Sequence, residues 1–329
     1  MNVQPLPQPR AAHAPHWSPL ALALIIDWFL GEPPDTLHPV AWFGWLVTAM
    51  EQRAPQAQPD RELRYGAKIV GMGVLTAALS GYAVERIVER TAVSRGGHPH
   101  GGALLLMAGM LKTTFAWRAL LRAGAEVRQA LEREQTDTAR QALLALVSRD
   151  TTGLDATLLA AAAIESLAEN AGDAFVAPLL YYQLFGLPGA CAYRAVNTLD
   201  SMLGYHGRYE FLGKVPARFD DLVNWLPSRL TALAIVGAAA LLEADPQRAW
   251  QVLWQDHGKT ASPNAGYPMS AMAGALDISL EKVGHYRLNA AGRPPTPADI
   301  QRAARIVSLA LVLVVAFGAA LRGVLHRGR

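Results

Sequence analysis

A row of carboxylates interrupts one of the most apolar parts of this sequence. The stretch ESLAENAGD places Glu165, Glu169 and Asp173 at intervals of four residues, between LLAAAAI and AFVAPLLYY. Residues four apart lie on one helix face, where like charges repel unless a cation lies among them. Oxygen ligands on one face suit Mg²⁺, which often binds through one or two carboxylates plus substrate phosphates. The row therefore predicts a metal–phosphate site, and the alternative is a solvated helix face.

The surroundings of this row favour a functional site. Extending the helix back through SRDTTGLD places Thr151 and Asp155 in the same polar wedge as the three acids. Ionisable residues inside membrane segments usually face a cavity and mark a site of function. We therefore predict that Glu165, Glu169 and Asp173 are catalytic residues and metal ligands.

A second group of charges follows in YRAVNTLDSMLGYHGRYE and RFDDLVN, where basic and acidic residues alternate. Arginine forks bind phosphate in a bidentate manner, and Asp220 and Asp221 are predicted to complete a metal shell. The alternative is a network of salt bridges beside the membrane. The residues predicted to bind substrate or phosphate in the whole chain are Arg149, Arg194, Asn197, Arg208, Lys214, Arg218, Lys259 and Asn264.

The last two of these residues belong to the segment DHGKTASPNAGYP. Its GKT resembles part of a P-loop, but the pattern needs a glycine where Leu253 stands, and no strand precedes it. We reject that interpretation. The turn-forming SPNAGYP can instead present backbone N–H groups to an anion, with His257 and Lys259 adding positive charge.

A fourth polar group lies near the start of the chain, in DWFLGEPPDTLHPVAWFG. Its tryptophans fit an aromatic belt at a membrane surface. A belt followed by a turn explains most of the segment but not its ionisable residues, which are Asp27, Glu32, Asp35 and His38.

The composition indicates what positions these groups. Hydrophobic residues make up 51% of the 329 and charged residues only 17%, whereas an ordinary globular domain carries about 25% charge. Uncharged runs of helical length occur at 69–84 and 306–321, and no long alternating strand pattern stands out. We predict an all-α polytopic membrane bundle of about five to seven helices, with a soluble helical protein as the alternative.

The chain is expected to form a single membrane-embedded domain over 18–329, with folded polar loops near 205–224 and 243–297. Residues 1–17 are rich in Pro, Gln and His and predict a disordered tail. The net charge of +3 comes from scattered Lys and Arg, so we predict no nucleic-acid partner. The single cysteine, Cys191, excludes an intramolecular disulfide and is interpreted as a packing residue.

Six blocks together resemble the cobalamin-biosynthesis CbiB/CobD family, adenosylcobinamide-phosphate synthase. They occur in the family's order between Asp27 and Leu276, and the set is specific although each block alone is modest. The blocks are DWFLGEPPDTLHPVAWFG, SRDTTGLD, AIESLAENAGDAFVAPLLYY, AYRAVNTLDSMLGY, RFDDLVNWLPSRLTA and SPNAGYPMSAMAGAL.

The resemblance implies a multi-pass enzyme of the bacterial cytoplasmic membrane. The family joins a propionate of adenosylcobyric acid to aminopropanol phosphate or a related aminoalcohol, with consumption of ATP and with the corrinoid as substrate. Mg²⁺, membrane lipid and other late-pathway cobalamin enzymes are the further partners expected. Two other functions fit the acidic helix face: a Mg²⁺-dependent prenyl or phosphatidyl transferase acting on a diphosphate, and a transporter.

Overall fold

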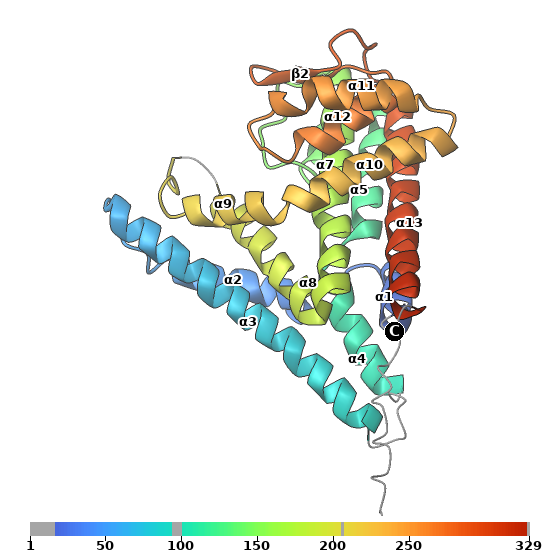
Figure 1. Ribbon diagram of the computed structural model, residues 1–329. Helices are drawn as coiled ribbons and strands as arrows, with labels where there is room; N and C mark the ends of the chain where they lie inside the picture. The colour runs from blue at the N-terminus through green and yellow to red at the C-terminus, as the bar shows by residue number, and fades with distance from the viewer. Residues whose placement is uncertain (1–16, 94–100, 205–206, 328–329) are drawn as a thin grey trace, which may run out of the picture.

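The computed structural model of the chain describes residues 17–93, 101–204 and 207–327 (Figure 1). The predicted tail lies outside these residues except for Trp17, which begins α1. The elements are α1 (Trp17–Leu30), η1 (Asp35–Leu37), α2 (Pro39–Glu51), α3 (Pro59–Val93), α4 (Gly101–Lys112), α5 (Trp117–Glu132), α6 (Thr136–Leu143), α7 (Ala156–Ala171), η2 (Gly172–Val176), α8 (Ala177–Leu203), α9 (Lys214–Val223), α10 (Trp225–Leu241), α11 (Pro246–Asp256), η3 (His257–Lys259), α12 (Gly266–Ala275), β1 (Leu280–Lys282), β2 (Tyr286–Leu288) and α13 (Pro297–Arg327).

The predicted all-α bundle is confirmed. Three helical stretches of the described chain are long and apolar enough to cross a membrane, and the number rises to five if each of two bent pairs is one span. The apolar runs predicted at 69–84 and 306–321 lie within α3 and α13. The bent pairs are α4 with α5 and α9 with α10. The upper count of five spans equals the lower limit of the predicted five to seven membrane helices.

The chain folds back on itself in the middle of α8. Gly186 has φ 70° and ψ −160°, a conformation suited to glycine, and Pro188 follows it. The second half of α8 then rises beside η2 and the first half (Figure 1). The Tyr193 hydroxyl donates to the Asp173 carbonyl at 3.2 Å, and the Tyr181 and Tyr193 rings stack at 5.3 Å. This reversal brings residues 194–200 next to the end of α7.

The long helix α3 holds this reversal in place. Glu85 Oε1 accepts a hydrogen bond of 2.6 Å from the Leu187 N–H, which the break in α8 leaves without a helical partner. Gly81 lies so close that a Cβ there would be 2.9 Å from the Leu187 carbonyl oxygen. The absence of a Cβ at Gly81 and the Glu85 carboxylate therefore fix where α8 turns.

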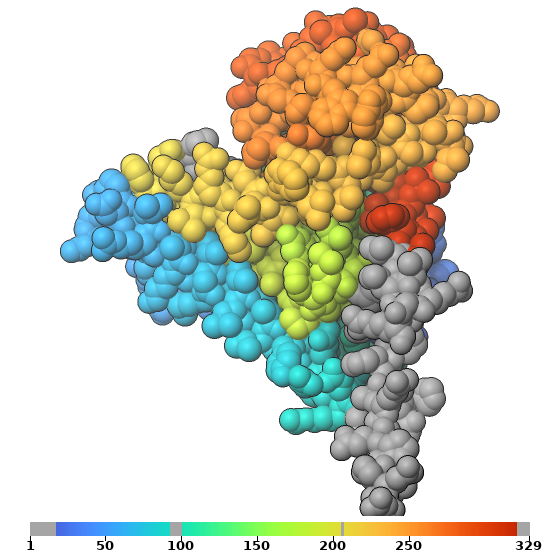
Figure 2. Space-filling view, viewed as in Figure 1, coloured from blue at the N-terminus to red at the C-terminus, as the bar shows by residue number. Residues whose placement is uncertain are grey.

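The two predicted polar loops contain regular structure. Within 205–224 the structure places helix α9, and within 243–297 it places α11, α12 and an antiparallel hairpin in which Leu280 pairs with Leu288. The elements within 243–297 cap one end of α5, α7 and α13, whereas α9 packs beside α8 and α3 (Figures 1 and 2). The largest core cluster joins this cap to α7 and α13, so cap and bundle share one apolar interior.

Candidate active site on the acidic face of α7

Helix α7 and the π-helical turn η2 position the three acids of the opening row. Glu165 and Glu169 lie on α7, and Asp173 lies in η2. Our backward extension of this helix is wrong. The Asp155 carboxylate accepts from the Leu158 N–H at 2.8 Å and so caps the helix at its start, while the Thr151 hydroxyl faces the Arg140 carbonyl.

The π-helical turn has a structural partner of its own. The Ala174 carbonyl accepts the Ala116 N–H at 3.1 Å, at the break between α4 and α5. Single π turns inside α-helices occur frequently at functional sites. Here the turn places Asp173 on the side where the returning half of α8 and helix α9 lie.

One end of the acidic face is electrically balanced. Arg149 donates to Glu165 Oε2 at 3.2 Å, and Glu165 is only 5% exposed. Lys282 of β1 acts electrostatically on both Glu165 and Glu169, and Tyr286 of β2 lies beside them. We call Arg149, Glu165, Glu169, Lys282 and Tyr286 the paired end. Two positive charges here face two negative ones.

Tyr286 is a hydrogen-bond donor at this end. Burial, and then the neighbouring Glu165 and Glu169, raise the pKa of its hydroxyl well above the ordinary value, so it stays protonated. The hydroxyl donates to Met269 Sδ at 3.8 Å, a weak partner. Glu165 Oε1 is buried without a hydrogen bond. Tyr286 also interacts with Glu165 as a hydrogen-bonding partner, so the paired end holds a carboxylate acceptor and a hydroxyl donor side by side.

The other end carries more negative charge. Asp173 interacts electrostatically with Asp220 of α9, with Glu169 and with Asp200 of α8. Asn224 donates to Asp220 Oδ2 at 2.9 Å, whereas Asp220 Oδ1 is buried without a hydrogen bond. We call Asp173, Asp200 and Asp220 the acidic end. Arg194 is the positive charge that acts on Asp173.

Arg194 has few partners of its own. Its Nη1 donates to Asn197 Oδ1 at 3.3 Å, and its Nε is buried without a hydrogen bond. It also interacts electrostatically with Glu32, at the far side from the acidic end. The sequence-predicted pair Arg194 and Asn197 is therefore next to the acids, as the fold-back of α8 requires.

The described residues include no group of three or more His, Cys, Asp or Glu side chains arranged to hold a metal. The structure divides four of the five predicted ligands between the two ends. Asp221 is paired with Arg218, and its metal role stays a prediction like theirs. Mg²⁺ bound by one or two carboxylates plus phosphate oxygens needs fewer protein ligands, and the bare oxygens of Glu165 and Asp220 fit that role.

Other predicted phosphate-binding residues have partners outside the two ends, and Lys214 is an exposed residue at the start of α9. Asn264 holds the SPNAGYP turn against α9 and α10, because its Nδ2 donates to the Asp221 carbonyl at 2.7 Å. Their binding roles stay predictions. The ion pairs are Arg208 with Glu51 at 3.1 Å, Arg218 with Asp221 at 3.6 Å and Lys259 with Asp256 at 2.6 Å.

Sequence reasoning missed Lys282 and Tyr286. The run LEKVGHYRL has strand-like ends around a Gly, which is a hairpin signal, and Gly284 takes φ 75° in its turn. The run lies more than a hundred residues from α7, so only the packing of β1 on α7 reveals that these side chains meet Glu165.

A second buried charge cluster lies at the break between α4 and α5. Lys112 Nζ is 3.0 Å from Asp27 Oδ1 and 2.6 Å from Glu32 Oε1, and the Arg118 N–H donates to Asp27 Oδ2 at 2.9 Å. His38 contacts the other Glu32 oxygen. Burial tends to raise the pKa of Glu32, but hydrogen bonds from His38 and Lys112 outweigh it, so the pKa is lowered. We call this group the Lys112 cluster.

Fold and site together define a polytopic helical bundle of membrane type with a charged site inside it. Residues 20–307 match the family model described as CobD/Cbib protein. The chain belongs to this family, which confirms the resemblance found in the six sequence blocks. No solved structure matches the chain.

Named relatives agree with this assignment. The cobalamin biosynthesis protein CobD of Dehalococcoides mccartyi is 43% identical over 279 residues, which are 85% of this chain and 88% of that protein. A probable cobalamin biosynthesis protein CobD of Methanothrix thermoacetophila is 37% identical over 93% of this chain and 96% of its own length. A probable cobalamin biosynthesis protein CobD of Methanothermobacter thermautotrophicus is 38% identical over 94% of this chain and 97% of its own length. These comparisons give no support to the diphosphate-transferase alternative.

Proposed function

We propose that this protein is a cobalamin-biosynthesis enzyme that forms an amide bond with the help of ATP. It joins a propionate carboxylate of adenosylcobyric acid to the amine of aminopropanol phosphate, or of a related aminoalcohol, and yields adenosylcobinamide phosphate. The proposal combines membership of the CobD/Cbib family with one structural observation. That observation is an acidic face whose two ends differ in charge balance.

The reaction balances as follows. A carboxylate does not react with an amine directly, so ATP first converts it to an acyl phosphate with release of ADP, or to an acyl adenylate with release of pyrophosphate. The amine nitrogen attacks the acyl carbon, the C–N bond forms, and phosphate or AMP leaves. The incoming ammonium group must lose a proton before it attacks.

The acidic end suits the amine. Asp173, Asp200 and Asp220 lie together, and a bound ammonium group would stabilise their ionised forms, which favours a cation over a neutral ligand. One of these carboxylates accepts the ammonium proton in the proposed reaction. General-base catalysis of this kind contributes typically about 10²–10⁴-fold.

The paired end suits phosphate. Arg149 and Lys282 supply positive charge, and Tyr286 supplies a hydroxyl donor. Phosphate oxygens bound here stay close to Glu165, whose bare Oε1 fits a Mg²⁺ ion shared with the phosphate. Such an ion would neutralise charge on the phosphates of ATP. These groups hold developing charge in a site from which water is largely excluded.

The remaining assignments are part of the same proposal. We place the enzyme in the bacterial cytoplasmic membrane as a multi-pass protein, because its apolar helices need lipid around them. Contact with other late enzymes of cobalamin biosynthesis would pass the corrinoid on without release.

The test uses the purified full-length protein in detergent. It is incubated with adenosylcobyric acid, aminopropanol phosphate, ATP and Mg²⁺, and mass spectrometry follows both the amide product and the nucleotide. We expect adenosylcobinamide phosphate together with ADP or AMP, and no product when ATP is omitted. Absence of the amide with verified substrates, or its formation without ATP, would overturn the proposal.

A further inference from the structure

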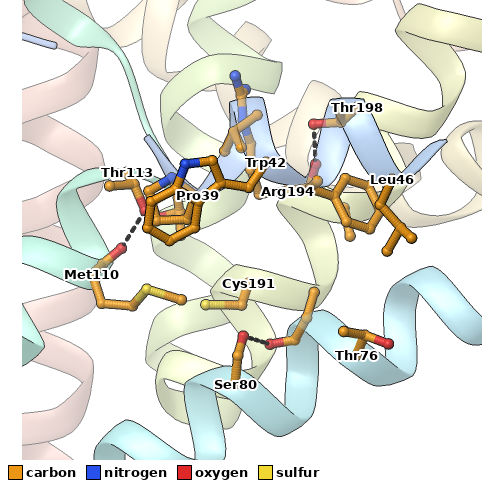
Figure 3. Close-up of a pocket in the computed structure, with 15 residues that line it drawn as sticks. Pro39, Trp42, Leu46, Thr76, Ser80, Met110, Thr113, Cys191, Arg194 and Thr198 are labelled. Atoms are coloured by element: carbon orange, nitrogen blue, oxygen red, sulfur yellow. Dashed lines mark hydrogen bonds between the residues drawn. The ribbon is translucent and has the colours of Figure 1, made fainter. Parts of the chain in front are cut away.

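A cavity of about 340 Å³ lies between α2, α3, α4 and α8 (Figure 3). Its lining is mainly apolar and includes Trp42, Leu46, Met110 and Cys191. A cavity of this size is too small for a corrinoid, and its only charged lining residue is Arg194. It suits a slender apolar group.

Most of the hydroxyl groups in its wall donate to backbone carbonyls. Ser80 donates to the Ala77 carbonyl at 2.8 Å, Thr113 to Met110 at 2.8 Å and Thr198 to Arg194 at 2.8 Å, each within its own helix. These bonds occupy the hydroxyl hydrogens, so the wall presents mostly carbon and sulfur. An apolar chain loses nothing by lying against it.

The cavity opens onto a surface that needs an apolar covering. Only 22% of the 18-residue apolar stretch within α3 is buried inside the protein. Leu75 and Leu79 of α3 are 59% and 55% exposed, and Thr76 and Ser80 at the cavity rim are exposed too. Figure 2 shows the long face of α3 uncovered by other elements on this side. Lipid is the solvent that such a face requires.

One charge stands at the end of the cavity. Figure 3 shows the Arg194 guanidinium directed away from Cys191 and Ser80, on the side where Trp42 lies. Its Nε is buried without a hydrogen bond. Trp42 is 49% exposed, and tryptophans of this kind lie at the level of lipid headgroups. A guanidinium beside them is complementary to a phosphate.

We propose that this cavity binds an anionic phospholipid of the surrounding membrane, with one acyl chain between α2, α3 and α8 and the phosphate at Arg194. The lipid lies next to the acidic end and fixes the position of Arg194. This assignment does not depend on the reaction proposed above.

The first experiment measures retained lipid. The full chain is placed in nanodiscs of equal phosphatidylglycerol and phosphatidylcholine, released into mild detergent, and weighed by native mass spectrometry. We expect phosphatidylglycerol to remain bound in preference. Thr76→Trp, which fills the rim, should lower retention about tenfold, the loss that two buried methylene groups give. Leu75→Trp, on the same helix but outside the lining, is the matched control.

Equal retention of the two lipids would contradict the role of Arg194, and unchanged retention in Thr76→Trp would contradict the cavity as the site. A second experiment needs no variant. Phosphatidylglycerol with a diazirine in its acyl chain is photolysed in the nanodiscs, and labelled peptides are mapped. Labels on the segments of Met110 and Cys191 support the proposal. Labels spread evenly over α3, or a cross-linked second copy of the chain at this face, would overturn it.

Discussion

Two buried charge clusters in this protein differ in how completely they are paired. In the Lys112 cluster, Asp27 has no exposed side-chain surface and Lys112 has 2%, and each charge has a partner within 3.0 Å. On the α7 face, Glu165 and Asp220 each keep a buried oxygen without a hydrogen bond. Asp27 Oδ1 also lacks hydrogen-bond geometry, but it lies 3.0 Å from Lys112 Nζ and so forms an ion pair. Removing one partner of a buried ion pair leaves the other charge unpaired and destabilises the fold. A buried polar atom that has no hydrogen bond can instead gain one from a ligand.

Substitutions in the Lys112 cluster should therefore destabilise the protein, whereas substitutions on the α7 face should lower its activity. Both clusters consist of acids in an apolar environment, and composition alone does not distinguish them. They differ in that Lys112 lies between Asp27 and Glu32 and contacts both within 3.0 Å, whereas the acidic end has only Arg194 acting on Asp173.

The largest effect is expected at the acidic end. Asp173→Asn keeps the size of the side chain and removes a carboxyl group on which Arg194 acts electrostatically, so thermal unfolding in detergent should change little. The rate of ATP-dependent amide formation should fall by about 10²–10⁴-fold, the range for loss of a general base or its equivalent. Asp137→Asn, whose side chain is 96% exposed, is the control. Near-normal rate and Mg²⁺ dependence in Asp173→Asn would remove this residue from the site.

The Lys112 cluster should respond in the opposite way. Lys112→Met leaves Asp27 buried and unpaired, which typically costs about 3–5 kcal/mol of folding free energy. Denaturant or thermal unfolding should show this loss, and Asp27→Asn added to the same chain should recover part of it. The exposed pair of Arg122 and Glu126 provides the control, since Arg122→Ala should change stability by less than about 1 kcal/mol. Equal losses of stability in Lys112→Met and Arg122→Ala would contradict a stabilising role of the Lys112 cluster.

The paired end should show an intermediate effect, on binding. Lys282→Met removes one of two positive charges, and a lost charge-assisted hydrogen bond of about 1.5–3 kcal/mol corresponds to a rise in KM of about 10–100-fold for the phosphate-bearing substrate. Lys282→Arg should restore most of it. His285→Ala, an exposed neighbour in the same hairpin, should leave KM unchanged. A fall in kcat with constant KM would instead assign Lys282 to the chemical step.

The smallest effect concerns acid stability. The pKa of Glu32 is lower in the folded protein than its ordinary value of 4.5. Its contribution to stability is therefore fully present above that value and is lost as the pH falls through the folded pKa. The difference in Tm between wild type and Glu32→Gln should be largest near pH 7 and should shrink below about pH 4.5. A difference independent of pH would show that Glu32 is not ionised in the folded state.

The helical repeat explains why part of the site was predictable. Four-residue spacing placed Glu165 and Glu169 on one face, and the apolar neighbours distinguished that face from a surface helix. The same reasoning failed at Asp155, because the carboxylate of a capping residue ends the helix that the spacing alone would continue. The spacing of residues does not predict where a helix begins unless its capping residue is recognised.

Long-range partners were beyond such reasoning. Nothing local relates Lys112 to Asp27, and the pattern of residues in DWFLGEPPD contains acids without indicating which cation balances them. The same holds for Arg208, whose position in a run of alternating charges suggested phosphate, although it pairs with Glu51 of α2.

The sequence by itself determined that this protein is a helical membrane-type bundle of the CobD/Cbib family with an acidic helix face. Hydropathy, four-residue spacing and the order of six blocks are all properties of the linear chain. Only the tertiary structure decided which acids are neutralised. The reversal at Gly186 and the packing of the 280–288 hairpin on α7 bring charges together across long stretches of chain, and pairing depends on distance in space.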